Sequence, residues 1–87
     1  MKVRKRDGRI QDFNLGKIRL TIERVSDEVQ MPLTGSDLDM ISKSIERDLA
    51  SRGEDIIDTA QIGKTVVAQL EDFGYKKIAV AYQGYTT

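Results

Sequence analysis

Basic side chains crowd the start of this 87-residue chain, where they could bind an anion. The chain balances 14 Lys and Arg against 14 Asp and Glu, so no global field draws it toward an anionic polymer or surface. The excess is local, and it comprises five of the first nine residues and one later lysine: Lys2, Arg4, Lys5, Arg6, Arg9 and Lys17. Hydrogen bonds from such cations to phosphate are charge-assisted and strong. The cluster predicts a site for a phosphate-bearing ligand.

The chemistry centres on Asn14, which we expect to cap a helix. A helix N-terminus has unpaired N–H groups and a partial positive charge, so a capping box places Glu or Gln at its third position. This sequence places Lys17 there, and Gly16 leaves the adjacent backbone open to a ligand. Both features favour a phosphate at the helix start. A solvated lysine beside a solubilising strand edge is the alternative, and the charge pattern alone leaves it open.

The cations before Asn14 are expected to lie on a β-hairpin. Residues 2–6 and 9–13 have the character of strands, and Asp7-Gly8 between them favours a two-residue type I′ turn. Val3, Ile10 and Phe13 are its apolar anchors. In the resulting register Arg6 faces Arg9, Lys5 faces Ile10 and Arg4 faces Gln11. Opposed arginines destabilise a hairpin, so we expect it to be loosely docked and to need support from other elements.

Helical spacing of apolar residues follows in four segments. The first begins at Asn14, the second begins at Ser36 and stops at Gly53, the third is capped by Asp58 or Thr59 and ends at Gly74, and the fourth covers 75–85. Residues 26–35 are expected to form a loop and 54–57 a short extended link. The prediction is an α+β fold in one domain, residues 1–87, with an N-terminal hairpin capping four helices.

Several function classes are not expected. Cysteine and histidine are absent, which removes disulfides, thiol nucleophiles and the commonest general base and metal ligand. We find no nucleophile–base pair, and therefore expect no catalytic residue and no enzyme activity. We also expect no metal site. With no apolar run long enough for a bilayer and no signal peptide, we expect a cytoplasmic protein without membrane contact.

Two further patterns are expected to be silent. Gly63-Lys64-Thr65 resembles the end of a P-loop, but Asp58 stands where the earlier glycine belongs, and the triplet falls inside a predicted helix. Four acidic residues are expected to be a solvated face rather than a metal site: Asp37, Asp39, Glu46 and Asp48.

The three tyrosines are assigned to the core or its rim, with stacking on a base as the lesser alternative: Tyr75, Tyr82 and Tyr85.

Three stretches, in order along the chain, closely resemble the ATP-cone domain family. They are VRKRDGRIQDFNLGKI at residues 3–18, LDMISKSIERDLASRG at 38–53 and IIDTAQIGKTVVAQLEDFGYKKIAVAY at 56–82. The first contains the family's V-x-K-R-D-G pattern followed by Asn and K-[IL], the second its terminal R-G, and the third its G-x-x-x-[IV]-A-x-A-Y signature. Several motifs in the correct order are far more specific than any one alone.

The resemblance implies a regulatory module in which a β-hairpin lid covers a small four-helix bundle and ATP or dATP binds beneath it, with Mg²⁺ as a candidate companion. Such domains occur at the N-terminus of ribonucleotide reductases, in a zinc-ribbon repressor of reductase genes and beside some kinase-like domains. Position by position, Val3 matches the residue near the nucleobase, Lys5 and Arg6 the lid cations, Asn14 and Lys17 the helix-start pair, and Thr59 a polar residue facing the same pocket. Gln11 stands where some members have an acidic residue that reads base or ribose, and Gly16 where the residue is often acidic.

The implied partner is a purine nucleoside triphosphate, together with a second copy of the chain or a separate catalytic or regulatory domain. The expected mechanism is that triphosphate neutralises the Arg6–Arg9 repulsion, orders the hairpin and so couples ligand to shape. Two alternatives remain: a small nucleic-acid-binding module that uses the basic hairpin, and a plain oligomerisation domain. We do not expect nucleic acid to be a partner.

Overall fold

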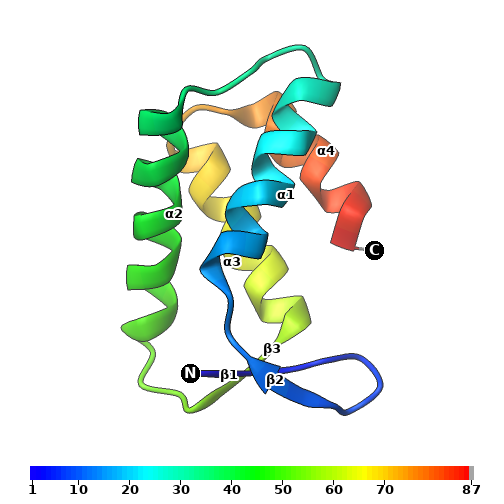
Figure 1. Ribbon diagram of the computed structural model, residues 1–87, viewed down its shortest axis with the longest axis vertical. Coiled ribbons are helices and arrows are strands. Elements are labelled where there is room, and N and C mark those ends of the chain that lie inside the picture. The colour runs from blue at the N-terminus through cyan, green and yellow to red at the C-terminus, as the bar shows by residue number, and fades with distance from the viewer. Residues whose placement is uncertain (87) are drawn as a thin grey trace.

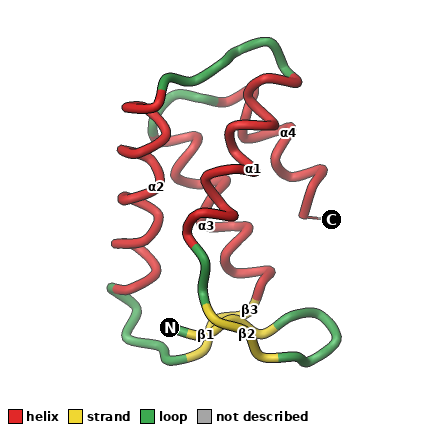
Figure 2. Tube along the Cα trace, in the orientation of Figure 1, coloured by secondary structure: helices red, strands yellow, loops and turns green. Residues whose placement is uncertain are grey.

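Four helices and a small three-stranded sheet make up the described part of the molecule (Figures 1 and 2). The computed structural model describes residues 1–86, and Thr87 lies outside the described part. The order is β1 (Lys2–Arg4), β2 (Ile10–Asp12), α1 (Leu15–Glu28), α2 (Gly35–Ala50), β3 (Ile56–Asp58), α3 (Thr59–Asp72) and α4 (Lys76–Thr86). The predicted α+β class is confirmed. No helix in this range is long and apolar enough to cross a membrane.

The sheet has the order β2-β1-β3, with β1 antiparallel to β2 and parallel to β3. In this sheet Val3 is the Cα partner of both Gln11 and Ile57. The third strand was expected only as an extended link. Its pairing partner lies more than 50 residues away in the chain, so no local pattern of residues 54–57 could have identified it. This pairing ties the N-terminal hairpin to the start of α3.

The predicted hairpin register is wrong by one residue. Arg4 pairs with Ile10, and the loop has three residues, because the Lys5 N–H donates to the Arg9 carbonyl at 2.8 Å and the Gly8 N–H donates to the Lys5 carbonyl at 2.9 Å. Gly8 takes a φ of 89°, which fits a turn followed by a left-handed glycine bulge. The Asp7-Gly8 pair fits a three-residue loop and a two-residue turn equally well, because glycine supplies the positive φ that both require.

The expected repulsion between Arg6 and Arg9 is therefore wrong as well. Arg6 lies in the loop, and the Arg9 guanidinium pairs with Asp7, Nε to Oδ2 at 2.6 Å. Asp7 also accepts the Arg9 N–H at 3.1 Å, which closes the loop locally. Ile10, expected as an apolar anchor, is 47% exposed, whereas Val3 is buried and Phe13 packs against the core.

Apolar stripes at helical spacing bury the core between the helices. Its fully buried large side chains come from all four helices and from β3: Ile22, Val25, Leu38, Ile41, Ile45, Leu49, Ile57, Val66, Leu70 and Ile78. Each helix buries one face against its neighbours, as amphipathic periodicity requires. Gly53 and Gly74, the predicted stops, take φ of 68° and 88° just after α2 and α3.

The predicted helix starts are close to those observed. Asn14 caps α1 as expected, and its side-chain oxygen accepts the Lys17 N–H at 3.2 Å. The second helix begins at Gly35 rather than Ser36, because Thr34 and Asp37 form a reciprocal capping box. Because β2 leads into α1 and β3 leads directly into α3, both of these helices begin at the sheet (Figure 1).

Candidate functional site

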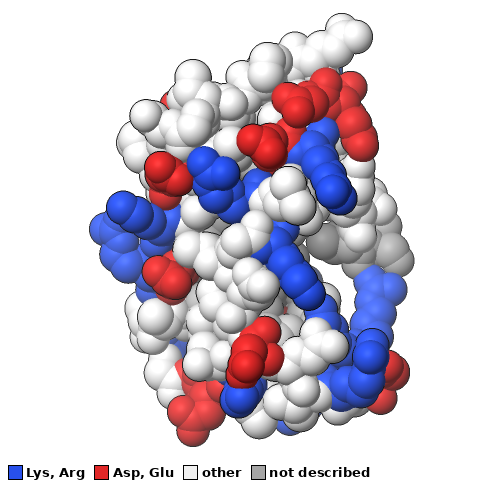
Figure 3. All heavy atoms as spheres, in the orientation of Figure 1, with Lys and Arg blue, Asp and Glu red and all other residues white. Residues whose placement is uncertain are grey.

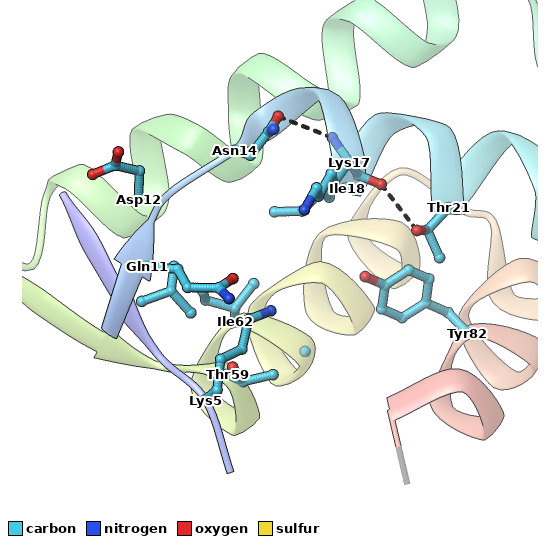
Figure 4. Close-up of a pocket in the computed structure, with 12 residues that line it drawn as sticks. Lys5, Gln11, Asp12, Asn14, Lys17, Ile18, Thr21, Thr59, Ile62 and Tyr82 are labelled. Carbon is cyan, nitrogen blue, oxygen red and sulfur yellow. Dashed lines mark hydrogen bonds between the residues drawn. The ribbon is translucent and has the colours of Figure 1, made fainter. Parts of the chain in front are cut away.

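A small cavity lies between the sheet and the first turns of α1 and α3 (Figure 4). Its volume is about 180 Å³. Six of the seven residues proposed from sequence line it: Val3, Lys5, Gln11, Asn14, Lys17 and Thr59. The remaining lining residues are Asp12, Ile18, Thr21, Ile62, Gly63 and Tyr82. Segments from both ends of the chain therefore contribute to one site.

Arg6, the seventh predicted residue, does not line this cavity. It lines an adjoining depression of about 260 Å³ at the start of α3, together with Arg4, Asp58 and Ala60. Lys5 and Thr59 line both hollows, so the two lie side by side and together make up a recess. In the space-filling view, Lys and Arg atoms gather around a hollow beside the hairpin (Figure 3).

The cavity has an apolar floor and a polar rim. Val3, Ile62 and Tyr82 are buried, and Ile18 packs against the core beside them. Burial raises the pKa of the Tyr82 hydroxyl above its ordinary value, so this group stays protonated at neutral pH. Its oxygen is directed toward the cavity from α4 (Figure 4). An apolar surface with a few convergent polar groups is typical of sites for small organic ligands.

Not all of the N-terminal cations are available to a ligand. Lys2 pairs with Asp12, Arg4 with Asp58 at 3.3 Å and Arg9 with Asp7. Lys5 and Lys17 differ, since neither has an ion-pair partner among residues 1–86. Both line the cavity, one from the hairpin and one from α1. The fold thus neutralises the surrounding cations and leaves these two ammonium groups to face a shared space.

Two helix N-termini reinforce the positive potential there. Neither α1 nor α3 has an acidic residue in its first turn, and the side chain of Asp58, the N-cap of α3, does not cap that helix. The free N–H groups and the helix dipoles of both starts favour an anion. Among the described residues that line the cavity, Asp12 alone carries a carboxylate. Its hydrogen bond with Lys2, and then the charge of Lys2, hold the pKa of Asp12 below its ordinary value.

The hydroxyl groups at the site have defined roles. The Thr59 Oγ1 donates to the Arg4 carbonyl at 3.0 Å, which ties α3 to β1. The Thr21 Oγ1 donates to the Lys17 carbonyl at 2.9 Å. Each has therefore used its single proton within the protein and offers the cavity an acceptor. Such oxygens suit a donor, such as an amino or hydroxyl group of a ligand.

Sequence reasoning missed part of the lining. Ile18 and Thr21 follow Asn14 and Lys17 by one helical turn, so the spacing of α1 contained the signal that would have identified them. Tyr82 was assigned to the core or its rim and is buried while also lining the cavity. No local pattern of α4 predicts that contact, because it depends on how α4 packs against α1 and α3.

Several residues of the patterns expected to be silent have structural roles. Gly63-Lys64-Thr65 lies inside α3 rather than in a phosphate-binding loop. Within it, the Thr65 hydroxyl accepts from Arg52 at 2.6 Å. Three of the four acidic residues have partners: Asp37 caps α2, Asp39 binds Arg19 at 3.1 Å and Asp48 binds Arg52 at 3.6 Å. Residues 1–86 contain no cluster of three or more potential metal ligands.

Tyr85 is exposed and donates to Glu28 instead of packing in the core.

Three curated proteins are similar to this chain in sequence. The transcriptional repressor NrdR of Thermomicrobium roseum is 31% identical over 88 residues, which cover 98% of this chain and 53% of that protein. NrdR of Halalkalibacterium halodurans is 30% identical over 84 residues, covering 93% of this chain and 54% of that protein. NrdR of Bifidobacterium animalis subsp. lactis is 26% identical over 86 residues, covering 95% and 42%. The chain spans about half the length of these curated relatives.

The relatives bear on one expectation about partners. Their names describe regulators of transcription, so the expectation that nucleic acid is not a partner has no support from them. The sequence profile of the ATP cone domain family matches residues 1–87, which is the whole chain. The chain belongs to the ATP cone domain family.

Proposed function

We propose that this chain is a regulatory, non-catalytic module that binds ATP or dATP in the recess between the hairpin, α1 and α3. One observation carries the proposal: Lys5 and Lys17 line the same cavity and have no carboxylate partner among the described residues. Two uncompensated cations beside two helix N-termini favour a multiply charged anion. Membership of the ATP cone family narrows that anion to a purine nucleoside triphosphate.

The shape of the recess suggests how the nucleotide would lie. At about 180 Å³ the cavity is smaller than the ~300–1,000 Å³ that small-molecule sites usually offer, so it would hold only part of the ligand. In the proposed pose the base rests on the apolar floor near Val3, with Gln11 at its edge. The phosphates then run past Lys5 and Lys17 toward Arg6, into the adjoining depression of about 260 Å³.

The energetics are compatible with regulation by cellular nucleotide levels. A hydrogen bond to a charged group contributes roughly 1.5–3 kcal/mol. Three such bonds, from Lys5, Lys17 and Arg6, give roughly 4.5–9 kcal/mol before the cost of lost ligand freedom, so a micromolar Kd, about 8.2 kcal/mol, also needs the contacts of the base with the apolar floor. Asn14 would contact ribose or phosphate while it still caps α1, and Thr59 would act as an acceptor. Mg²⁺ would arrive with the phosphates and use at most Asp12 from the protein, since Mg²⁺ needs only one or two carboxylates beside its substrate oxygens.

The ligand would regulate the conformation of the chain because it would contact several elements at once. Lys5 belongs to the hairpin, Lys17 to α1 and Thr59 to α3, so one nucleotide would contact three separately placed elements. Binding would therefore favour one arrangement of the hairpin over the helices, with the hairpin acting as a lid. The altered surface would then act on a second copy or on a separate domain. The relatives named as transcriptional repressors make control of transcription the output we favour.

Calorimetric titration of the chain with ATP, dATP, GTP and AMP tests this proposal. We expect binding of ATP and dATP in the micromolar range, and far weaker binding of AMP, which lacks the phosphates that Lys5 and Lys17 would contact. Lys5→Ala should weaken ATP binding at least tenfold, since it removes a charge-assisted hydrogen bond. Absence of heat with every nucleotide would remove the proposal. Indifference to mononucleotides combined with steeply salt-dependent binding of oligonucleotides would favour the nucleic-acid alternative.

A further inference from the structure

The acidic residues of the recess decide whether a nucleotide could bring Mg²⁺ with it. Magnesium beside a nucleotide is usually held by one or two protein carboxylates together with the phosphate oxygens. Two carboxylates lie along the recess, since Asp12 lines the cavity and Asp58 lines the adjoining depression. The number of acids alone would therefore allow a metal, and the surroundings of each acid become the deciding feature.

Both carboxylates already have a cationic partner. Asp12 pairs with Lys2, and Asp58 pairs with Arg4 at 3.3 Å. The Asp12 side chain is 83% exposed, and Figure 4 shows its carboxylate directed away from Lys17. A metal ion at either acid would have to displace an ammonium or guanidinium group from it. These residues do not fit Mg²⁺.

The side chains best placed for the phosphates are cations instead. Lys5 and Lys17 line the cavity, and neither has an ion-pair partner within the described part of the chain. The N-termini of α1 and α3 add partial positive charges, and neither helix has an acidic residue in its first turn. The protein itself therefore supplies the countercharge that Mg²⁺ supplies to a nucleoside triphosphate in water.

We propose that the recess binds the metal-free triphosphate in preference to its Mg²⁺ complex and leaves the metal in solution. Mg²⁺ cancels two negative charges of the triphosphate, which weakens its attraction to Lys5 and Lys17. A metal ion on the phosphates would also lie close to these ammonium groups, and like charges repel. The inference rests on the proposed function and adds the ionic form of its ligand.

Exclusion of the metal makes the chain responsive to Mg²⁺ as well as to the nucleotide. Binding linkage is reciprocal, so a site that disfavours the Mg²⁺ complex binds ATP more weakly as free Mg²⁺ rises. At a fixed total ATP concentration, a fall in free Mg²⁺ then acts on the domain as a rise in ATP does. The recess would respond to the metal-free part of the nucleotide pool.

Calorimetric titration with ATP, in EDTA and at several free Mg²⁺ concentrations, tests the inference. The ionic strength is held constant with KCl, because salt screens exposed charges. We expect the apparent Kd for ATP to be lowest in EDTA and to rise about tenfold or more once Mg²⁺ saturates the nucleotide. An apparent Kd that does not change with Mg²⁺, or that falls when Mg²⁺ is added, overturns the inference.

Two substitutions of Lys17 test whether the ammonium groups cause the preference. Lys17→Gln should bind metal-free ATP more weakly and show a smaller ratio of the Kd in Mg²⁺ to the Kd in EDTA. Lys17→Glu should reverse the trend, so that Mg²⁺ strengthens binding, because a carboxylate then faces the phosphates. Glutamate is the residue that a capping box prefers at this position, so the helix start is retained.

Lys43→Gln is the matched control, because Lys43 is exposed on α2 and lies outside the recess. It should keep the native ratio of the two Kd values. A weaker affinity in Lys17→Gln with the native ratio unchanged would refute the role of this lysine in selecting the ionic form. A smaller ratio in Lys43→Gln as well would show that overall charge, rather than the recess, sets the preference.

The same titrations separate this inference from the proposed function. Absence of heat with ATP both in EDTA and in Mg²⁺ would refute nucleotide binding itself. Binding that requires Mg²⁺ would refute the inference alone and leave the nucleotide site in place.

Discussion

Replacing Lys17 by alanine removes an ammonium group from the first turn of α1 without touching the cap of that helix. The cap uses the Lys17 main-chain N–H, which donates to Asn14, and the Thr21 hydroxyl binds the Lys17 main-chain carbonyl. Both bonds survive the substitution. The side chain has no ion-pair partner among the described residues, so no carboxylate is left unpaired either.

Binding and folding should respond in opposite directions. Loss of one charge-assisted hydrogen bond of about 1.5–3 kcal/mol lowers the affinity for ATP roughly 10- to 150-fold. The folded chain without ligand should become more stable, because a cation at a helix N-terminus opposes the helix dipole by about 0.3–1 kcal/mol. Alanine is also the better helix former. In a domain of this size the gain raises the melting temperature by a few degrees.

Calorimetry with ATP and thermal unfolding without ligand measure the two effects on the same preparation. Lys43→Ala is the matched control, since it removes a lysine from an exposed position of α2 that lies outside the recess. We expect no change in ATP affinity for this control. An unchanged affinity in Lys17→Ala would refute the assignment of Lys17 to the ligand. A joint fall in affinity and stability would mean that the lysine supports the fold.

Two further substitutions test neighbouring contacts. Asn14→Ala removes the side-chain cap of α1 and should lower the free energy of unfolding by about 0.5–2 kcal/mol. Because Asn14 also lines the cavity, ATP affinity should fall with it, unlike the divergence expected for Lys17→Ala. Asp12→Asn tests the ion pair with Lys2. Since that pair lowers the pKa of Asp12, its contribution is present above the ordinary value of 3.8 and is lost as pH falls through the lower folded-state pKa. In acid titrations followed by circular dichroism, the Asp12→Asn variant should be less stable than the native chain at neutral pH. The difference in stability should disappear once the pH falls below the folded-state pKa of Asp12. A difference that stays constant across pH would exclude the ion pair as its cause.

The helices were predictable because their signals are local. Apolar spacing, the Asn14 cap and the glycine stops all act within a few residues, and the observed ends agree with them to within a few residues. The sheet was less predictable. Asp7-Gly8 fits loops of two or three residues, and the difference moves the register by one. The pairing of β1 with β3 joins residues separated by two helices and leaves no pattern within either strand.

The composition of the recess was predicted better than its electrostatics. Six of the residues selected from the sequence line one cavity. That they bind a nucleotide stays a prediction. The sequence could not distinguish paired from unpaired cations, because the pairing depends on the register and on β3. Asp12 meets Lys2 across the hairpin, and Asp58 meets Arg4 across the parallel pair.

The basic cluster therefore contains two kinds of cation, those with an acidic partner and those without one. Cross-strand acidic partners for Lys2 and Arg4 allow three short strands to carry a high density of positive charge without self-repulsion. Lys5 follows β1 at the point where the chain enters the loop, beyond these partners. Lys17 lies in the first turn of α1, where a helix is least stabilised by a cation. Neither ammonium group has an ion-pair partner within the described fold, and Lys17 also opposes the helix dipole. A bound polyphosphate would neutralise both groups at once because they line the same cavity, so affinity should depend on the two lysines together more than on either alone. A double-mutant cycle of Lys5→Ala and Lys17→Ala measured with ATP would show this dependence as a combined loss that differs from the sum of the single losses, and simple additivity would argue that the two groups contact the ligand independently.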